Sequence, residues 1–186
     1  GKTVHEFNPE TMTKTYSDEL LQDVGKSYYP NMNGGFGFTA SWKGLSLNAD
    51  FAFVLNKYMM NMDYQFSTNT DNAKNGFNQS RDMLKMWKKP GDITDIPGLA
   101  SKNVLDTRVL QNASFLRLKN LTLSYSLPQQ WMQATRFFDS VRIYATARNL
   151  FTATKYKGGD PELDSNLALG FYPSTRQYML GVEVSF

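Results

Sequence analysis

The feature that most constrains this chain is a strict alternation of apolar and polar residues over segments of about ten residues. In LSLNADFAFVLN, residues 45–56, every second residue up to Leu55 is apolar. GFGFTASW, residues 35–42, alternates in the same way, and Lys43-Gly44 separates the two segments. A period of two places the apolar side chains on one face of a strand. We therefore expect an antiparallel hairpin with one apolar face and a tight turn.

Three later segments have the same period: SFLRLKNLTLSYSLP from residue 114, VRIYATARNLF from residue 141, and YMLGVEVSF from residue 178. In the first of these the apolar positions change parity between Leu118 and Leu121. An extra residue in one strand restores the face of the strand after such a change. The sequence therefore predicts an all-β chain of antiparallel strands, with a β-bulge near Lys119-Asn120.

The connections between these segments differ widely in length. In chain order they have two residues, roughly fifty, roughly a dozen and roughly two dozen. Such an alternation of short turns with long loops is typical of membrane β-barrels. The long connections are residues 63–114 and 152–175. Within the first of them we expect a short helix that ends near Trp87, in the segment DNAKNGFNQSRDMLKMW. Strands of about eleven residues also match the length that a tilted strand needs to cross a bilayer.

Composition excludes several classes of function. The chain has no cysteine and a single histidine, so thiol catalysis and zinc–thiolate sites are absent. Its net charge of +3 is spread along the chain without the basic run of a nucleic-acid binder. No apolar run approaches the roughly 18 residues of a membrane-spanning helix. With no paired carboxylates or nucleophile–base set to place, we expect no enzyme activity, no catalytic or metal site, no cofactor and no nucleic-acid partner.

Two environments would suit strands with one apolar face. In a β-sandwich that face meets another sheet, and in a barrel it meets lipid. Aromatic residues near the strand ends favour the barrel, because their rings settle at the membrane interface. A small carbohydrate-binding β-sandwich remains an alternative. So does a small passive outer-membrane pore, although a pore needs at least about eight strands.

Several motifs resemble one family. Between Ser114 and Pro128 the chain has the motifs SFLRLKN and LSYSLP, and after them, up to Glu162, it has ARNLF, KY and GDPE. Two longer motifs come before these: YYPNMNGGFGFTASWKGLSL and MWKKPGDITDIPGL. These motifs resemble the C-terminal part of SusC/RagA-type TonB-dependent outer-membrane transporters of Bacteroidetes. The resemblance implies antiparallel transmembrane strands of a large barrel of about 22 strands that a plug fills. Residues 1–186 would supply five or six of these strands, the sixth within residues 1–16, without the plug domain.

The resemblance also implies a function and partners. Such a transporter imports a glycan or oligopeptide through the bacterial outer membrane, with a SusD-like surface lipoprotein as a lid and energy from the TonB complex acting through the plug. Further partners would be the remainder of the barrel and membrane lipid. The alternating C-terminal strand resembles the barrel-assembly signal of outer-membrane proteins, with a periplasmic C-terminus; its residues are Tyr178, Leu180, Val182, Val184 and Phe186.

The implied topology places residues 63–114 and 152–175 outside the cell. The polar candidates for lid or substrate contact in these loops are Asp92, Asp95, Asp160 and Glu162, although Pro-Gly-Asp and Asp-Pro-Glu also form turns, which is the interpretation we favour. On the polar face of the strand from residue 141, the lumen-facing candidates are Arg142, Tyr144 and Arg148. Because the barrel is filled, we expect these three to pack against the plug.

Overall fold

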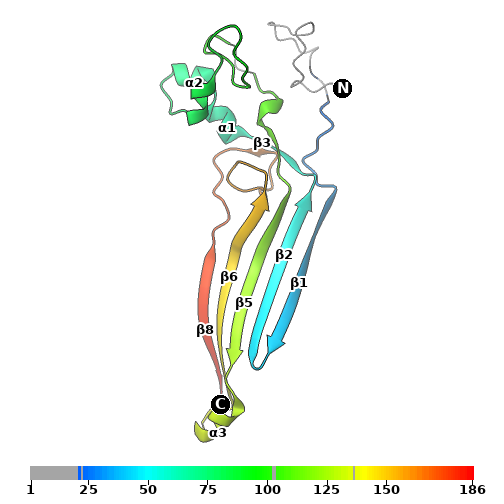
Figure 1. Ribbon diagram of the computed structural model, residues 1–186, viewed down its shortest axis with the longest axis vertical. Helices are drawn as coiled ribbons and strands as arrows, with labels where there is room; N and C mark the ends of the chain where they lie inside the picture. Colours follow the sequence, from blue (N-terminus) through cyan, green and yellow to red (C-terminus); the bar gives the residue numbers. More distant parts are fainter. Residues whose placement is uncertain (1–20, 22, 102–103, 136) are drawn as a thin grey trace.

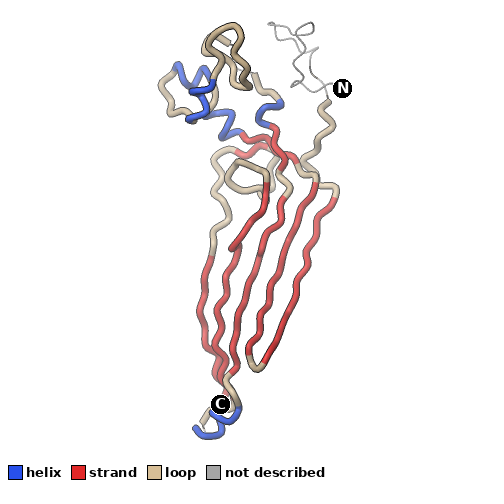
Figure 2. The backbone as a smooth tube through the Cα atoms, in the orientation of Figure 1, coloured by secondary structure: helices blue, strands red, loops and turns tan. Residues whose placement is uncertain are grey.

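A computed structural model describes residues 21, 23–101, 104–135 and 137–186. Five long strands lie side by side in one layer, as Figures 1 and 2 show. Two long loops and most helices gather at one end of this layer, whereas a short helix and the C-terminus lie at the other end (Figure 1). The sixth strand expected within residues 1–16 lies outside the described residues.

The large sheet is antiparallel throughout, with the strand order β1-β2-β5-β6-β8. Its strands are β1 (Met32–Trp42), β2 (Leu45–Leu55), β5 (Phe115–Ser126), β6 (Ser140–Thr154) and β8 (Gln177–Ser185). Within the described residues β1 and β8 each have a neighbour on one side only, so the sheet is open at both edges. The predicted all-β antiparallel fold is confirmed, and these strands do not close into a barrel among themselves.

The register places the apolar side chains of all five strands on one face. Phe36 lies opposite Phe51, which lies opposite Leu118 on β5. On the far side of β6, Ala145 lies opposite Leu180. Large side chains on this face are exposed; they include Phe36, Phe38, Trp42, Leu123, Ile143, Phe151, Leu180 and Val182. The predicted bulge is confirmed, because the β2–β5 and β5–β6 registers both shift at Lys119.

The opposite face of the sheet carries hydroxyl and amide side chains that bond across the strands. Ser41 and Ser46 are joined at 3.0 Å, and Asn48 Nδ2 donates to Thr39 Oγ1 at 3.0 Å. Further along, Thr122 and Thr146 are joined at 3.0 Å. These side chains thus pair with one another across the strands, and we call this side of the sheet the polar face.

The turn between β1 and β2 is the predicted two-residue connection. Lys43 and Gly44 have φ angles of 47° and 86°, as a type I′ hairpin turn requires. A Cβ atom added at Gly44 would lie 2.7 Å from the carbonyl oxygen of Ser126. Glycine is therefore needed here for its backbone conformation and for the space it leaves.

Gly44→Ala should destabilise the protein more than Gly91→Ala. Gly91 also has a positive φ, of 97°, but an added Cβ would meet nothing within 4 Å. Its substitution should cost only the left-handed backbone penalty of about 1–2 kcal/mol, whereas the Gly44 substitution adds the clash. Thermal unfolding of the transporter that carries each substitution, followed by circular dichroism of the β-sheet, measures both. Equal losses would contradict this assignment.

The first long loop, residues 56–114, is more structured than its polar sequence indicated. It contains β3 (Tyr58–Asn61), α1 (Met62–Ser67), α2 (Thr70–Lys74), the 3₁₀ helices η2 (Arg81–Lys85) and η3 (Thr107–Val109), and β4 (Leu110–Asn112). The single helix predicted to end near Trp87 is wrong, because α2 and η2 are separate. Asn75 ends α2, and Gly76 follows with a φ of 80°.

The remaining connections also differ from the predicted bounds. β6 continues to Thr154, so the second long loop is residues 155–176, and it contains β7 (Leu167–Ala168). At the other end of the sheet, α3 (Gln129–Thr135) lies in the connection between β5 and β6. No helix in the described part of the chain is long and apolar enough to cross a membrane.

The main hydrophobic cluster lies at the loop end and not on the large sheet. It consists of Met59, Ala113, Tyr156 and Ala168, against which Tyr28 and Leu163 pack. Met59 and Ala168 belong to a small sheet of β4, β3 and β7, in which β3 pairs antiparallel with β4 and parallel with β7. This cluster is thus built from residues of both long loops.

Candidate functional site

A network of buried charges joins the second long loop to the polar face of β5. Arg117 projects from β5, where its register partner on β6 is Thr152, and its side chain is 4% exposed. Its Nη2 lies 2.5 Å from Asp160 Oδ1, its Nη1 lies 2.5 Å from Glu162 Oε2, and its Nε donates to Thr152 Oγ1 at 2.9 Å. Lys119 pairs with the other oxygen of Glu162. One guanidinium thus binds two carboxylates of the loop, which we call the Arg117 network.

Asp160 is the most enclosed carboxylate of this network. Its Oδ1 also accepts from the backbone N–H of Glu162 at 2.9 Å, and its Oδ2 accepts from that of Ser174 at 2.8 Å. Burial alone would raise the pKa of Asp160, but the hydrogen bonds from Arg117, Ser174 and Glu162 hold it well below its usual range. Asp160 therefore stays ionised and closes the loop onto itself while it binds the strand.

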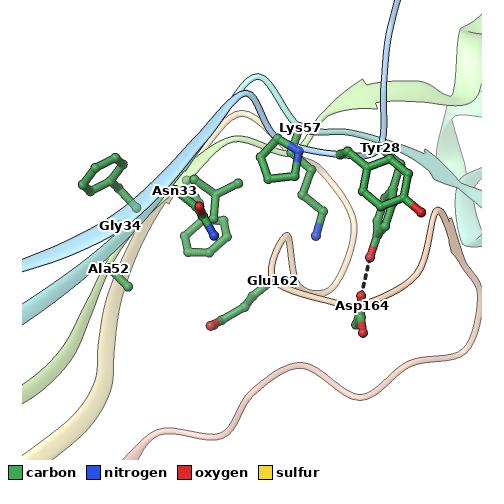
Figure 3. Close-up of a pocket in the computed structure, with 12 residues that line it drawn as sticks. Tyr28, Asn33, Gly34, Ala52, Lys57, Glu162 and Asp164 are labelled. Carbon is green, nitrogen blue, oxygen red and sulfur yellow. Dashed lines mark hydrogen bonds between the residues drawn. The ribbon is translucent and has the colours of Figure 1, made fainter.

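A second cation, Lys57, holds the loop from the other side. Its Nζ donates to the carbonyl oxygens of Pro161 at 3.1 Å and Leu163 at 2.7 Å, and lies 5.0 Å from the centre of the Tyr28 ring. Tyr28 in turn donates to Asp164 Oδ1 at 2.7 Å, as Figure 3 shows. Burial and this bond to Asp164 raise the pKa of Tyr28 to about 12. The segment before β1 is thereby tied to the same loop.

A cavity of about 450 Å³ lies beside the ends of β1 and β2 (Figure 3). Lys57, Glu162 and Asp164 line it together with aromatic rings. Arg117 and Lys119 form ion pairs with Asp160 and Glu162. Lys57 donates to two backbone carbonyl groups, and Asp164 accepts from the hydroxyl of Tyr28. Because each charge has a partner, the arrangement suits the fixing of a loop better than acid–base chemistry. Among the described residues, no group of histidine, aspartate and glutamate has the geometry of a metal site.

The structure separates the loop candidates into two places. Asp160 and Glu162 come together in the Arg117 network. Asp92 lies in the first loop, where its Oδ2 accepts from the backbone N–H groups of Lys88 and Lys89, as in the turn that we expected. Asp95 lies exposed in the same loop. Contact of these four residues with a lid or a substrate stays a prediction.

The three candidates on β6 lie on the polar face. Arg142 donates to Ser124 Oγ at 3.3 Å and lies 3.6 Å from Glu183 on β8. The ring of Tyr144 covers Gly181, so that an added Cβ at Gly181 would overlap it. Arg148 lies in register with Asn120. The five residues of the C-terminal assembly pattern alternate along β8 as far as Val184, whereas Phe186 lies beyond the strand with its ring 5.4 Å from that of Phe138.

Sequence reasoning missed the basic half of the site. Arg117, Lys119 and Lys57 were not among the candidates, nor was Tyr28, which donates to Asp164. A usable signal was present, since Arg117 stands between Leu116 and Leu118 and so must face away from lipid. A charge at such a position, with the acidic GDPE motif in the next long loop, predicts an ion pair between the polar face of the strand and that loop.

The chain was compared with known proteins. No family model matches it. It is 30% identical over 174 residues to the TonB-dependent receptor SusC of Bacteroides thetaiotaomicron, which covers 93% of this chain and 16% of that protein. It is 28% identical over 170 residues to the TonB-dependent receptor P3 of Formosa agariphila, covering 84% of this chain and 16% of that protein. The chain thus spans about a sixth of the length of these curated relatives.

Solved structures give a closer match. The RagAB peptide importer in its "open-open" state has 43% sequence identity and a TM-score of 0.85, over 94% of this chain and 19% of that chain. The chain belongs to the SusC/RagA type of TonB-dependent transporters. Its residues correspond to the C-terminal portion of such a protein. The "closed-closed" state of the RagAB importer matches with the same identity, TM-score and coverage.

That the chain belongs to the SusC/RagA type explains why both edges of the large sheet are open. A SusC/RagA-type barrel continues beyond the strands described here, so β1 and β8 have further neighbours in the whole barrel. The Arg117 network lies on the polar face of the sheet, at the end that carries the long loops.

Proposed function

We propose that this chain forms part of the barrel wall of an outer-membrane importer that takes up an oligopeptide or a glycan. The observation that carries the proposal is the five-stranded antiparallel sheet with one exposed apolar face and one polar, hydrogen-bonded face, together with its similarity to a peptide importer. The whole importer would draw energy from the TonB complex through its plug. The higher identity with the RagAB peptide importer favours an oligopeptide as the substrate.

The proposed topology follows from the two ends of the sheet. Both long loops leave at one end, whereas the two-residue turn, α3 and the C-terminus lie at the other (Figure 1). Long loops of membrane barrels lie outside the cell, so we assign residues 56–114 and 155–176 to the cell surface and the C-terminus to the periplasm. There the loops would meet the SusD-like lid lipoprotein, and Arg142, Tyr144 and Arg148 would face the plug.

Aromatic side chains at the turn end support this placement in a membrane. Trp42, Trp131, Phe137 and Phe186 are all exposed there, and Lys43 Nζ lies 4.9 Å from the centre of the Trp42 ring. Rings of this kind are enriched where a membrane meets water.

The two alternative functions have less support. A β-sandwich needs a second sheet on the apolar face, but in the described part of the chain the only other sheet, β4-β3-β7, lies at the end of the strands. A small passive pore needs a closed wall, whereas five strands leave two open edges.

The test is uptake by cells that carry or lack the gene for the whole transporter. We expect the deletion strain to lose uptake of labelled oligopeptides, and a plasmid copy to restore it. A protonophore should abolish the restored uptake, because the TonB complex depends on the proton gradient. Loss of oligosaccharide uptake in place of oligopeptide uptake would change the substrate class to a glycan. Unchanged uptake of both classes would contradict the proposed function.

A further inference from the structure

The two long loops are joined by backbone pairing. β3, at the start of the first loop, pairs in parallel with β7 of the second loop through Met60–Leu167 and Asn61–Ala168. Next to this pairing, the backbone N–H of Gly170 donates to Asp63 Oδ1 at 2.8 Å. The loops therefore share one small sheet.

The loops also share a buried interior. Met59 and Ala113 of the first loop are in one hydrophobic cluster with Tyr156 and Ala168 of the second loop. Met59 and Ala113 have no exposed surface at all. Separating the loops would expose this cluster to water and leave the ammonium group of Lys57 without its two carbonyl partners.

The shared body is fixed to the large sheet. The Arg117 network joins the second loop to β5, and Thr154 Oγ1 on β6 donates to the carbonyl oxygen of Ser114, just before β5, at 2.8 Å. The backbone N–H of Asn56 donates to Ser114 Oγ at 2.9 Å, so the end of β2 is held at the same place. We call residues 56–63, 110–114 and 155–170, which carry these contacts, the loop platform.

The comparison with RagAB gives an independent observation. The chain matches the "open-open" and "closed-closed" states of that importer equally, with a TM-score of 0.85 over 94% of its residues in each case. As a whole, the corresponding part of RagAB therefore resembles this chain equally well in both states.

We infer that the loop platform is a rigid part of the importer, which keeps its shape while the transporter opens and closes. The inference rests on the proposed function, because it concerns the transport cycle. The platform then acts as a fixed support at the mouth of the barrel, and the parts that move during transport lie outside it. A lid that touches the platform meets the same surface in every state.

A disulfide across the platform tests the inference in the whole transporter. The chain has no cysteine of its own. Met60 and Leu167 are paired neighbours on β3 and β7, and adjacent strands lie about 4.8 Å apart, within the range that a disulfide spans. We expect the double variant Met60→Cys/Leu167→Cys to form the bond on mild oxidation and to import its substrate at the same initial rate before and after oxidation.

Three other outcomes would each have a distinct meaning. Import that stops on oxidation and returns with dithiothreitol would overturn the inference, because the loops must then separate in each cycle. Failure of the disulfide to form would overturn the juxtaposition of β3 and β7. Absence of import in cells with the unmodified transporter would instead contradict the proposed function. The single variants Met60→Cys and Leu167→Cys are the matched controls for oxidation and for each substitution.

Discussion

Arg117→Ala is expected to destabilise the transporter by about 3–5 kcal/mol, the usual effect of removing one partner of a buried ion pair. The substitution leaves Asp160 buried and charged, with its side chain only 3% exposed, and removes one of the cations beside Glu162. The second long loop should detach from β5 as a result. The midpoint of thermal unfolding and the rate of protease cleavage within residues 155–176 would measure the two effects.

Arg142→Ala is the matched control for this prediction. Arg142 lies on the same face of the sheet, but its side chain is 47% exposed and lies 3.6 Å from Glu183. Ion pairs that are open to solvent contribute about 0–1 kcal/mol. If both substitutions gave the same small loss, and the loop stayed resistant to protease, the Arg117 network would not be what holds the loop.

Leu180→Arg is expected to reduce the amount of folded transporter in the outer membrane sharply. Leu180 is 82% exposed on the apolar face of β8, in register with Ala145. An arginine that faces lipid costs about 2–4 kcal/mol near the middle of a bilayer. The fraction of protein that keeps its folded mobility in unheated gel samples of membrane fractions measures the loss.

Met179→Arg tests whether the effect depends on the face of the strand. Met179 is the preceding residue of β8 and lies opposite Thr146 on the polar face, where other arginines are accommodated. We expect this variant to keep most of its folded fraction. A loss of folded protein as large as that of Leu180→Arg would mean that the two faces of β8 lie in equally apolar environments. That result would contradict the membrane placement.

The large sheet could be predicted from the sequence because its information is local. A period of two assigns each side chain to a face, and a change of parity at Lys119 reveals the bulge without any knowledge of the neighbouring strands. The Lys43-Gly44 turn is equally local, since a two-residue turn with positive φ requires such residues. These features needed no knowledge of which distant segments meet.

The loop platform could not be predicted in the same way. β3, β4 and β7 have four, three and two residues, too few to show a period. Their pairing depends on the large sheet bringing the two loops together. The role of Asp160 was only half predicted: its turn bond to the backbone of Glu162 is local, whereas its bond to Arg117 crosses 43 residues of sequence.

The long sequence separations within the platform have a consequence for how the protein folds. Asp63 and Gly170 are 107 residues apart, and Lys57 and Leu163 are 106 apart. Bringing such distant residues together has a large entropic cost of loop closure. This cost falls once structure between them has formed and shortened the flexible loop that must close. We therefore expect the hairpin of β1 and β2 to form early, and the platform to form after β5 and β6 have paired. Its completion therefore marks a late stage of assembly, reached only by a chain whose strands are already in register.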